Sequence, residues 1–168
     1  MKKLLITGGT GVLGQKLVET LSLQKRYEIF FTYNGSKKIA KDLSEKFHVK
    51  SIQVTDADIS NVPRKIDIVV NAAGVGAFGG LTHTVSDLLM HKAFEVNLML
   101  PFKISKLVLP HMMKQNWGRI VNISSINGLR GYEYTVSYNT TKFALNGLTR
   151  TIAKEYAKYN ITCNIMYP

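Results

Sequence analysis

The stretch ITGGTGVLG, residues 6–14, stands between a short apolar run and an amphipathic segment. Gly9, Gly11 and Gly14 have G-x-G-x-x-G spacing, and apolar residues recur at helical intervals after them. Glycines allow a tight turn and let backbone N–H groups approach a pyrophosphate, which then lies at the positive N-terminus of the helix. We therefore predict a strand, a phosphate-binding turn and a helix; a glycine turn that merely reverses the chain is the alternative.

The rest of the chain alternates short apolar runs with longer amphipathic segments. The expected strands are residues 3–6, 27–32, 51–55, 66–70, 120–123 and 161–165, and the expected helices are residues 12–23, 36–47, 86–114 and 138–158. This alternation implies right-handed crossovers and a parallel sheet with helices on both faces. We expect one NAD(P)-binding domain over residues 1–168, a doubly wound α/β/α Rossmann fold. Residues 56–65 are too few for a crossover helix, so we expect a stub of helix there at most.

Composition indicates a soluble globular protein. Hydrophobic residues make up 45% and charged residues 20% of the 168 residues, and no apolar run reaches the ~20 residues that span a bilayer. The start MKKLLITGG has too short an apolar stretch for a secretion signal. The single Cys163 fits a reducing cytoplasm, and the four histidines lack ligand spacing, so we expect no membrane segment and no metal site.

The net charge of +11 calls for an explanation. The 22 Lys and Arg residues are scattered from Lys2 to Lys158, and the densest clusters are pairs such as Lys37 and Lys38. Nucleic-acid binders usually concentrate their charge in a stripe or tail. We therefore expect no dedicated nucleic-acid function; the charge favours anionic small molecules or an acidic protein partner.

The segment after the second expected strand indicates which dinucleotide is bound. An NAD site usually presents an acidic residue about 20 positions beyond the glycine turn. Here no acid stands between Glu28 and Asp42, and the segment contains Asn34, Ser36 and Lys37. A hydroxyl and an ammonium can bind a 2′-phosphate, so we favour NADP over NAD; the alternative is a solvated helix start.

Three further stretches carry a family resemblance. VVNAAG (69–74), GRIVNISS (118–125) and SYNTTKFALNGLTRTIAKEY (137–156), together with the glycine turn, resemble the classical branch of the short-chain dehydrogenase/reductase family over the whole chain. The specific signal is a serine thirteen residues before the tyrosine of a Tyr-x-x-x-Lys helix, with an asparagine on an earlier helix. The resemblance implies an NAD(P)-dependent oxidoreductase with catalytic residues Asn97, Ser125, Tyr138 and Lys142.

The chemistry of these residue types agrees with the resemblance. Positions i and i+4 of a helix share a face, so Tyr138 and Lys142 point into the same space. A free phenol ionises near pH ~10, and a nearby cation favours the phenolate. Ser125 would hold the carbonyl oxygen while Tyr138 protonates it, Lys142 would also hold the nicotinamide ribose, and Asn97 would keep a water in the proton relay. Ser124 is the competing serine, but the spacing selects Ser125.

The resemblance also implies a cofactor-binding set and two departures from the family pattern. Val12 replaces a glycine of the classical turn, and the spacing of Gly8, Gly11 and Gly14 is similar to that of the extended branch. Members also continue beyond Pro168 with a substrate lid and a last strand, which we expect this chain to lack. The implied cofactor contacts are Thr7, Gly8, Gly9, Gly11, Val12, Leu13, Gly14, Asn34, Ser36, Lys37, Asp58, Ile59, Asn71, Ala72, Ala73, Gly74, Tyr138, Lys142 and Pro168.

The sequence thus predicts an NADP-dependent reductase of ketones to secondary alcohols. GRIVNISSINGLRG and FTYNGS are nearest in texture to 3-oxoacyl-[acyl-carrier-protein] reductases of fatty acid biosynthesis. Two alternatives remain: a non-catalytic NADP-binding or interaction subunit, and an extended-type nucleotide-sugar epimerase. The expected partners are a ketone or acyl-thioester substrate, an acidic acyl carrier protein that Arg130 would contact, and further copies of the chain in a dimer or tetramer built on helices 86–114 and 138–158.

Overall fold

Six parallel strands form one sheet in the order β3-β2-β1-β4-β5-β6 in the part of the chain that is described. The computed structural model describes residues 1–55, 58–76 and 79–168. The doubly wound parallel sheet predicted from the sequence is confirmed, with every expected strand present to within a few residues. The strands are β1 (Lys2–Thr7), β2 (Tyr27–Tyr33), β3 (Lys50–Gln53), β4 (Ile68–Asn71), β5 (Gly118–Ile123) and β6 (Ile161–Met166).

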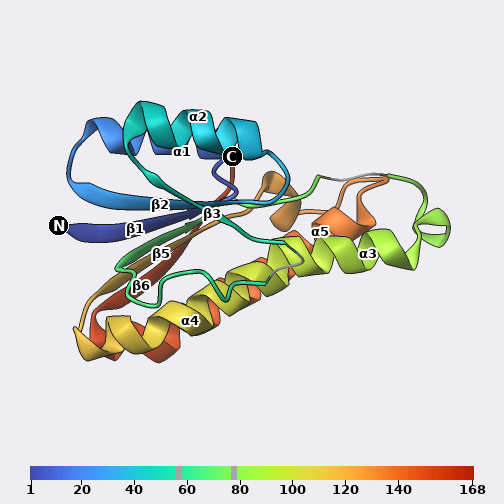
Figure 1. The fold of residues 1–168 in the computed structure, drawn as a ribbon. Coiled ribbons are helices and arrows are strands. Elements are labelled where there is room, and N and C mark those ends of the chain that lie inside the picture. The colour runs from blue at the N-terminus through green and yellow to red at the C-terminus, as the bar shows by residue number, and fades with distance from the viewer. Residues whose placement is uncertain (56–57, 77–78) are drawn as a thin grey trace.

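Helices cover both faces of the sheet, which completes three layers (Figure 1). On one face lie α1 (Val12–Leu23) and α2 (Lys37–Phe47), and on the other α3 (Asp87–Phe94), α4 (Leu100–Lys114) and α5 (Val136–Tyr156). Short 3₁₀ turns occur at Thr82–Thr84, Ile126–Gly128 and Ala157–Tyr159. The predicted bounds of α1 are confirmed, whereas α5 begins two residues earlier than expected and ends at Tyr156.

The prediction of a single helix over residues 86–114 is wrong in one respect. A π-helical turn, Glu95–Met99, separates α3 from α4. A π turn accommodates one more residue per turn than an α-helix and is found mostly at functional sites. Asn97 lies in this turn with a side chain that is almost fully buried. The apolar periodicity on either side continues, so the sequence pattern contains no sign of the interruption.

The connection between β3 and β4 is short, as expected. Its described residues, 54–55 and 58–67, form turns and no helix; the expectation for residues 56–57 lies outside the described residues. Asp58 N–H donates to the carbonyl of Thr55, and Val62 N–H donates to the carbonyl of Ile59. These turns carry the chain back under the sheet without a crossover helix.

Two apolar clusters hold the layers together, one on each face of the sheet. Towards α4 and α5 the cluster includes Leu5, Val69, Ile104, Ile120 and Ile152. Towards α1 and α2 it includes Ile6, Val18, Ile29, Phe31 and Leu43. Successive strand residues point to opposite faces, so strands covered on both sides must be apolar at consecutive positions. This is why β1 and β2 read as continuous apolar runs.

A buried polar ladder lies on the face of the sheet towards α4 and α5. The Asn71 amide donates to Asn122 Oδ1 at 2.8 Å, and the Asn122 amide donates to Thr149 Oγ1 at 2.9 Å. All three side chains are at most 3% exposed. Because buried polar groups are costly when unpaired, this ladder fixes β4 against β5 and β5 against α5. None of the helices in the described ranges is long and apolar enough to cross a membrane.

Candidate active site and cofactor cleft

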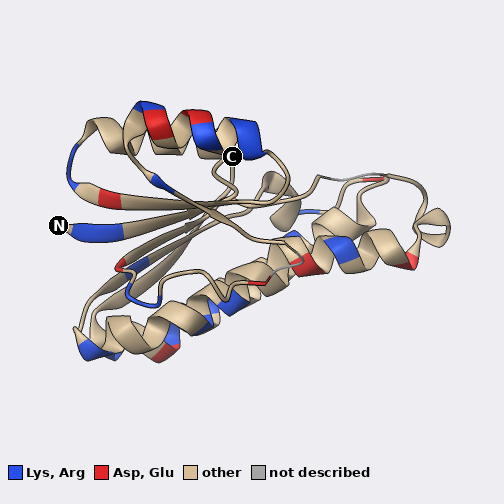
Figure 2. Cartoon of the chain, viewed as in Figure 1, with Lys and Arg blue, Asp and Glu red and all other residues tan. Residues whose placement is uncertain are grey.

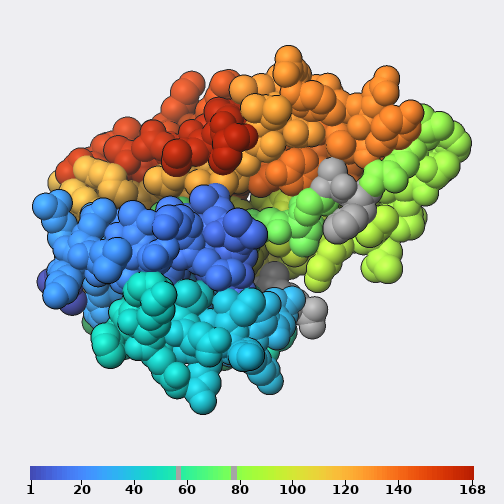
Figure 3. All heavy atoms as spheres, turned by 90° about the horizontal axis from the view of Figure 1, so that it is seen from above, coloured from blue at the N-terminus to red at the C-terminus, as the bar shows by residue number. Residues whose placement is uncertain are grey.

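The predicted site residues gather at the carboxyl edge of the sheet, where β1, β4 and β5 end. Open α/β sheets bind their ligands beyond this edge. Seen from above, the half of the molecule formed by α1 and α2 and the projecting segment of α3 and α5 make a re-entrant corner (Figure 3). The glycine turn lies on one side of this corner, and Tyr138 and Lys142 lie on the other.

The glycine turn packs tightly against the end of β4 and the start of α1. Gly8 has φ +67°, a conformation that side chains rarely adopt, and a Cβ there would lie 2.7 Å from Ala73 Cα. A Cβ on Gly14 would lie 2.1 Å from the Gly8 carbonyl oxygen, so α1 can begin this close to the turn only with glycine. Gly11 is the N-cap residue of α1 and supplies no side-chain cap. The first turn of α1 therefore presents backbone N–H groups, as an anion site requires.

A cleft of about 790 Å³ runs from this turn to α3. Six of the predicted cofactor residues line it: Gly8, Gly11, Asn34, Ala72, Ala73 and Gly74. The opposite wall includes Leu88, His91, Lys92, Glu95 and Val96. These residues of α3 and the π turn were missed from the sequence, although the i, i+4, i+8 spacing of Leu88, Lys92 and Val96 marks one helix face. The volume and the glycine-lined wall fit an extended dinucleotide.

Other predicted cofactor residues do not line this cleft. Thr7 and Asn71 are buried, and their side chains bond to the protein itself: Thr7 Oγ1 accepts from Ala73 N–H at 3.1 Å, and Asn71 bonds to Asn122. Their side chains position the strand ends rather than contact a ligand in the cleft. Gly9 and Gly14 are packed behind the turn, against Phe31 and Gly8.

The remaining members of that set lie at the periphery. Val12, Leu13, Ser36, Lys37, Asp58 and Pro168 are exposed, and Ile59 is partly buried. Val12, which stands where classical members have glycine, is 92% exposed, so its side chain does not obstruct the turn. Hydrogen bonds from the backbone and the hydroxyl of Ser60 lower the pKa of Asp58.

Lys142 is the most unusual ionisable group of the site. It is 4% exposed, and its ammonium donates to the carbonyl oxygen of Ile123 at 2.9 Å. Burial lowers the pKa of Lys142 to about 8, because a charged form is disfavoured away from water. Its Nζ also lies 5.4 Å from the centre of the Tyr138 ring. The structure therefore brings the phenol and the ammonium of the Tyr-x-x-x-Lys pair together, as predicted from the helical spacing.

Asn97 joins three segments around Lys142. Its Oδ1 accepts from Val75 N–H at 2.9 Å, and its amide donates to the Val75 carbonyl and to Thr141 Oγ1. A Cβ placed on Gly74 would lie 3.5 Å from Asn97 Oδ1 and 3.8 Å from Lys142 Nζ. Gly74, Asn97 and Lys142 are thus neighbours. Both amide protons of Asn97 are used within the protein, which leaves one lone pair on Oδ1 for a water.

The two serines after β5 differ in the way that the spacing predicts. Ser124 is 4% exposed, and its buried Oγ has no hydrogen-bond partner among the described residues. Ser125 is only partly buried; its hydroxyl donates to Asn127 Oδ1 and accepts from Asn127 N–H, both at 3.3 Å. Hydrogen bonds of that length are weak and easily exchanged for a ligand. Ser125 is therefore the more accessible of the two serines.

A network that sequence reasoning missed anchors the loop after Ser125 to the start of α5. Asn139 Oδ1 accepts from the Asn127 amide at 2.6 Å and from the Thr135 hydroxyl at 2.7 Å. Farther along this loop, Tyr134 has φ +60°, and a Cβ on Gly79 would lie 2.1 Å from the Tyr134 carbonyl oxygen. Two loops therefore meet beside Tyr138 and form one wall of the site.

No group of three or more His, Cys, Asp or Glu side chains among the described residues is placed to hold a metal ion.

Comparison with known proteins agrees with this geometry. The sequence model of the short chain dehydrogenase family matches residues 2–168. The chain is 35% identical to the 3-oxoacyl-[acyl-carrier-protein] reductase FabG of Aquifex aeolicus and 32% identical to FabG of Escherichia coli, over 98% of this chain and 71% of each relative. Among solved structures it is similar to ElxO with NADP bound, at 31% identity and a TM-score of 0.85, over 99% of this chain and 73% of ElxO. The chain belongs to the short-chain dehydrogenase/reductase family of enzymes.

Proposed function

We propose that the protein reduces a ketone to a secondary alcohol with NADPH, through Ser125, Tyr138, Lys142 and Asn97. The observation that carries the proposal is the burial of Lys142 within 5.4 Å of the Tyr138 ring, at the carboxyl edge of the sheet. Burial of an ammonium lowers the stability of the folded protein. Groups whose pKa is perturbed in this way cluster at functional sites.

In this mechanism each side chain has a separate task. NADPH, when bound along the cleft, supplies the hydride. Ser125 donates a hydrogen bond to the substrate carbonyl oxygen and holds it in place. Tyr138 donates its phenolic proton to that oxygen as the alcohol forms, and the Lys142 ammonium stabilises the resulting phenolate. Asn97 ties the Gly74–Val75 segment to α5 and offers its remaining lone pair to a water that returns a proton.

The cofactor preference rests on the start of α2. Ser36 is the N-cap residue of α2 but makes no side-chain hydrogen bond to the helix, and the first turn contains no acid. Lys37 and Lys38 are exposed beside it. A hydroxyl and two ammonium groups at a helix N-terminus suit a 2′-phosphate, whereas the first turn of α2 offers no carboxylate to accept the ribose hydroxyls of NAD. ElxO, 31% identical, has been solved with NADP and, as a variant, with NADPH.

For the substrate we propose a 3-oxoacyl thioester, which is the substrate class named for the FabG relatives. An acidic acyl carrier protein would deliver it, and the exposed Arg130 lies on the loop that borders Tyr138. We further propose a cytoplasmic homodimer or tetramer that acts in fatty acid biosynthesis. The extended-branch epimerase has only the glycine spacing in its favour.

A direct assay tests the proposal. Purified protein is titrated with NADPH and with NADH, and the nicotinamide absorbance is followed with short ketones, a 3-oxoacyl thioester and its carrier-linked form. The proposal predicts NADPH-dependent turnover of the 3-oxoacyl compounds that Tyr138→Phe abolishes. NADPH binding without turnover of any ketone would instead support the non-catalytic alternative.

A further inference from the structure

Basic side chains that are scattered in the sequence meet at the amino edge of the sheet, opposite the candidate active site. All strands of a parallel sheet begin at one edge, so the turns that lead into them lie side by side. Figure 2 shows Lys and Arg around the end of the molecule where the strands begin. We define the basic edge as the nine Lys and Arg residues in these turns and in the first two residues of each strand: Lys2, Lys3, Lys25, Arg26, Lys50, Arg64, Lys65, Arg119 and Lys158.

The same segments, with the turn into β4 taken as residues 60–67, contain only two carboxylates, and both are already used. Glu28 lies 2.6 Å from the Lys50 ammonium and 3.9 Å from that of Lys3. Asp67 is 7% exposed; its Oδ2 accepts from Lys3 N–H at 2.8 Å, and its Oδ1 accepts from the Gln115 amide at 2.7 Å. Nine cations against two engaged carboxylates leave seven of the eleven net positive charges at this edge.

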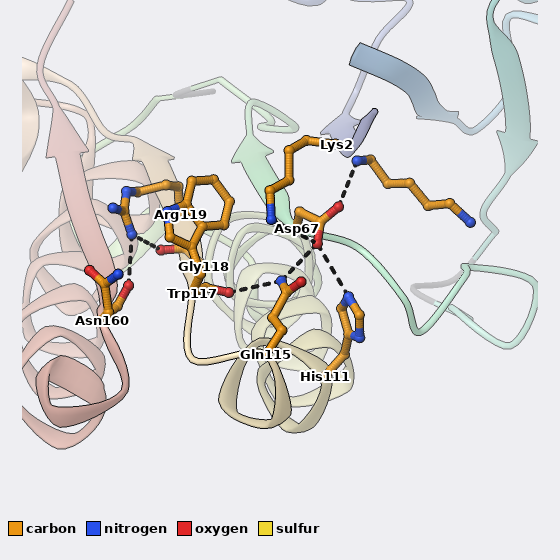
Figure 4. Close-up of polar contacts among 9 residues, drawn as sticks. Lys2, Asp67, His111, Gln115, Trp117, Gly118, Arg119 and Asn160 are labelled. Carbon is orange, nitrogen blue, oxygen red and sulfur yellow. Dashed lines mark hydrogen bonds and ion pairs between the residues drawn. The ribbon is translucent and has the colours of Figure 1, made fainter. Parts of the chain in front are cut away.

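Trp117, the only tryptophan of the chain, lies against Lys2 and Arg119 of the basic edge (Figure 4). The Lys2 ammonium stands 4.2 Å from the centre of its ring, and the Arg119 guanidinium 4.5 Å. Arg119 also donates to the carbonyls of Gly118 and Asn160, both at 2.7 Å. These contacts hold the central cations in fixed positions around an aromatic ring.

The outer cations are exposed and form no ion pairs with other described residues. These cations are Lys25, Arg26, Arg64, Lys65 and Lys158. They come from the turns before β2, β4 and β6, so they flank the central cluster on both sides. Side chains in this state can neutralise an external anion without first breaking an ion pair; Lys158 alone of the five has a cation–π contact among the described residues, 5.2 Å from the centre of the Tyr159 ring.

The shape and chemistry of the basic edge fit a linear polyanion better than a folded acidic protein. Protein interfaces usually bury an apolar centre. At this end the large exposed apolar side chains are Met1 and Leu23, and the partly buried Trp117 ring has the cations of Lys2 and Arg119 over it. Strands spaced by ~4.8 Å make a six-stranded edge about 24 Å wide. That width matches about seven base pairs of duplex at ~3.4 Å each. We propose that the basic edge binds the phosphate backbone of double-stranded nucleic acid, without sequence preference.

The test uses the chain's own tryptophan. A fluorescein-labelled 24-base-pair DNA duplex is titrated with protein, and anisotropy and Trp117 emission are recorded across a salt series. Binding should change Trp117 emission and weaken by two to three orders of magnitude between about 50 and 200 mM salt, as expected for about five phosphate contacts. The edge variant replaces Lys25, Arg26, Arg64 and Lys65 by Gln and should weaken binding at least tenfold.

The matched control removes the same charge elsewhere, with Lys16, Lys41, Lys106 and Arg150 replaced by Gln, all exposed on helices. It should change the affinity by less than about threefold, and circular dichroism verifies that both variants are folded. Equal losses in the two variants, or an affinity insensitive to salt, would overturn the proposal. Equal, edge-dependent binding of polyglutamate or of vesicles rich in phosphatidylglycerol would also overturn it, in favour of an acidic protein or a lipid surface. NADPH binding at the opposite edge should be unchanged in both variants.

Discussion

The ammonium of Lys142 donates a hydrogen bond to the carbonyl oxygen of Ile123, 2.9 Å away at the end of β5. This contact places the ammonium at the carboxyl end of β5, 5.4 Å from the centre of the Tyr138 ring. Because the ammonium is buried, its pKa falls to about 8. The consequences are measurable both in stability and in activity.

Lys142→Met should stabilise the protein near neutral pH. A pKa of about 8, against 10.5 for the free group, makes the buried ammonium unfavourable by about 3 kcal/mol below pH 8. The unfolded chain binds the extra proton between pH 8 and 10.5, so the disadvantage of Lys142 shrinks as the pH rises through this range. Urea denaturation at pH 7 and pH 10 measures it, with the exposed Lys154→Met as control. A Met variant that is less stable than wild type at pH 7 would contradict the prediction that the buried Lys142 ammonium destabilises the folded protein.

Tyr138→Phe should lower ketone reduction by about 10²–10⁴-fold, because the proton donor is lost while the ring remains. The affinity for NADPH should change little, as measured by fluorescence titration. Tyr156→Phe, farther along α5, is the matched control and should retain activity. Substantial turnover in Tyr138→Phe would remove the phenol from the mechanism.

Replacing Lys37 and Lys38 by Ala should weaken NADPH at least tenfold and NADH much less, since charge-assisted bonds to the 2′-phosphate are lost. The double variant Lys41→Ala with Lys46→Ala removes the same charge from the middle and end of α2 and serves as control. A wild-type preference for NADH would show that the lack of an acidic residue after β2 does not indicate NADP.

Thr141→Val tests whether Asn97 acts through its position. Thr141 is fully buried, and its hydroxyl accepts from the Asn97 amide and donates to the Tyr138 carbonyl. Loss of the hydroxyl leaves a buried amide proton unpaired, which costs about 1–3 kcal/mol of stability. If Asn97 positions the site, kcat should fall more than KM rises. The exposed Thr151→Val is the control, and a pure stability loss with unchanged kcat would reduce the Asn97–Thr141 pair to a structural role.

Asp67→Asn should destabilise the protein in a pH-dependent way. Burial acts to raise the pKa of Asp67, but hydrogen bonds from Lys3, Gln115 and His111 outweigh it and hold the pKa below its usual value. The stabilisation by the carboxylate is therefore present above about pH 4 and is lost as the pH falls through the lowered pKa. Thermal melts at pH 7 and pH 3 should show a larger difference between wild type and variant at pH 7 than at pH 3. The exposed Asp42→Asn should show none at either pH.

The parts of this fold that depend on local pattern could be predicted from the sequence. Consecutive apolar residues in β1 and β2 specify strands covered on both faces, and the glycine spacing specifies the turn between β1 and α1. The Tyr138–Lys142 neighbourhood follows from helical geometry alone. Each of these features is encoded within a few adjacent residues.

What could not be predicted depends on contacts between distant segments. The π turn at Asn97 is stabilised by Val75 and Thr141, which lie 22 and 44 positions away. The basic edge likewise exists only because parallel strands bring Lys25, Arg64 and Lys158 to one end. Spacing along the chain therefore could not reveal this cluster, and the duplex titration tests the sequence-based expectation that the protein has no dedicated nucleic-acid function.

The π turn also has a consequence for how the helix could have arisen. One surplus residue between α3 and α4 is equivalent to a single-codon insertion in a regular helix. Deleting one residue from Glu95–Met99 would restore unbroken α-helical hydrogen bonding but rotate one half of the helix by about 100° relative to the other. Either Asn97 or the α4 residues that face the core, such as Ile104, would then point the wrong way. The π turn therefore allows Asn97 to face the candidate active site and Ile104 to face the core within one continuous helix. A regular α-helix could not place both side chains correctly.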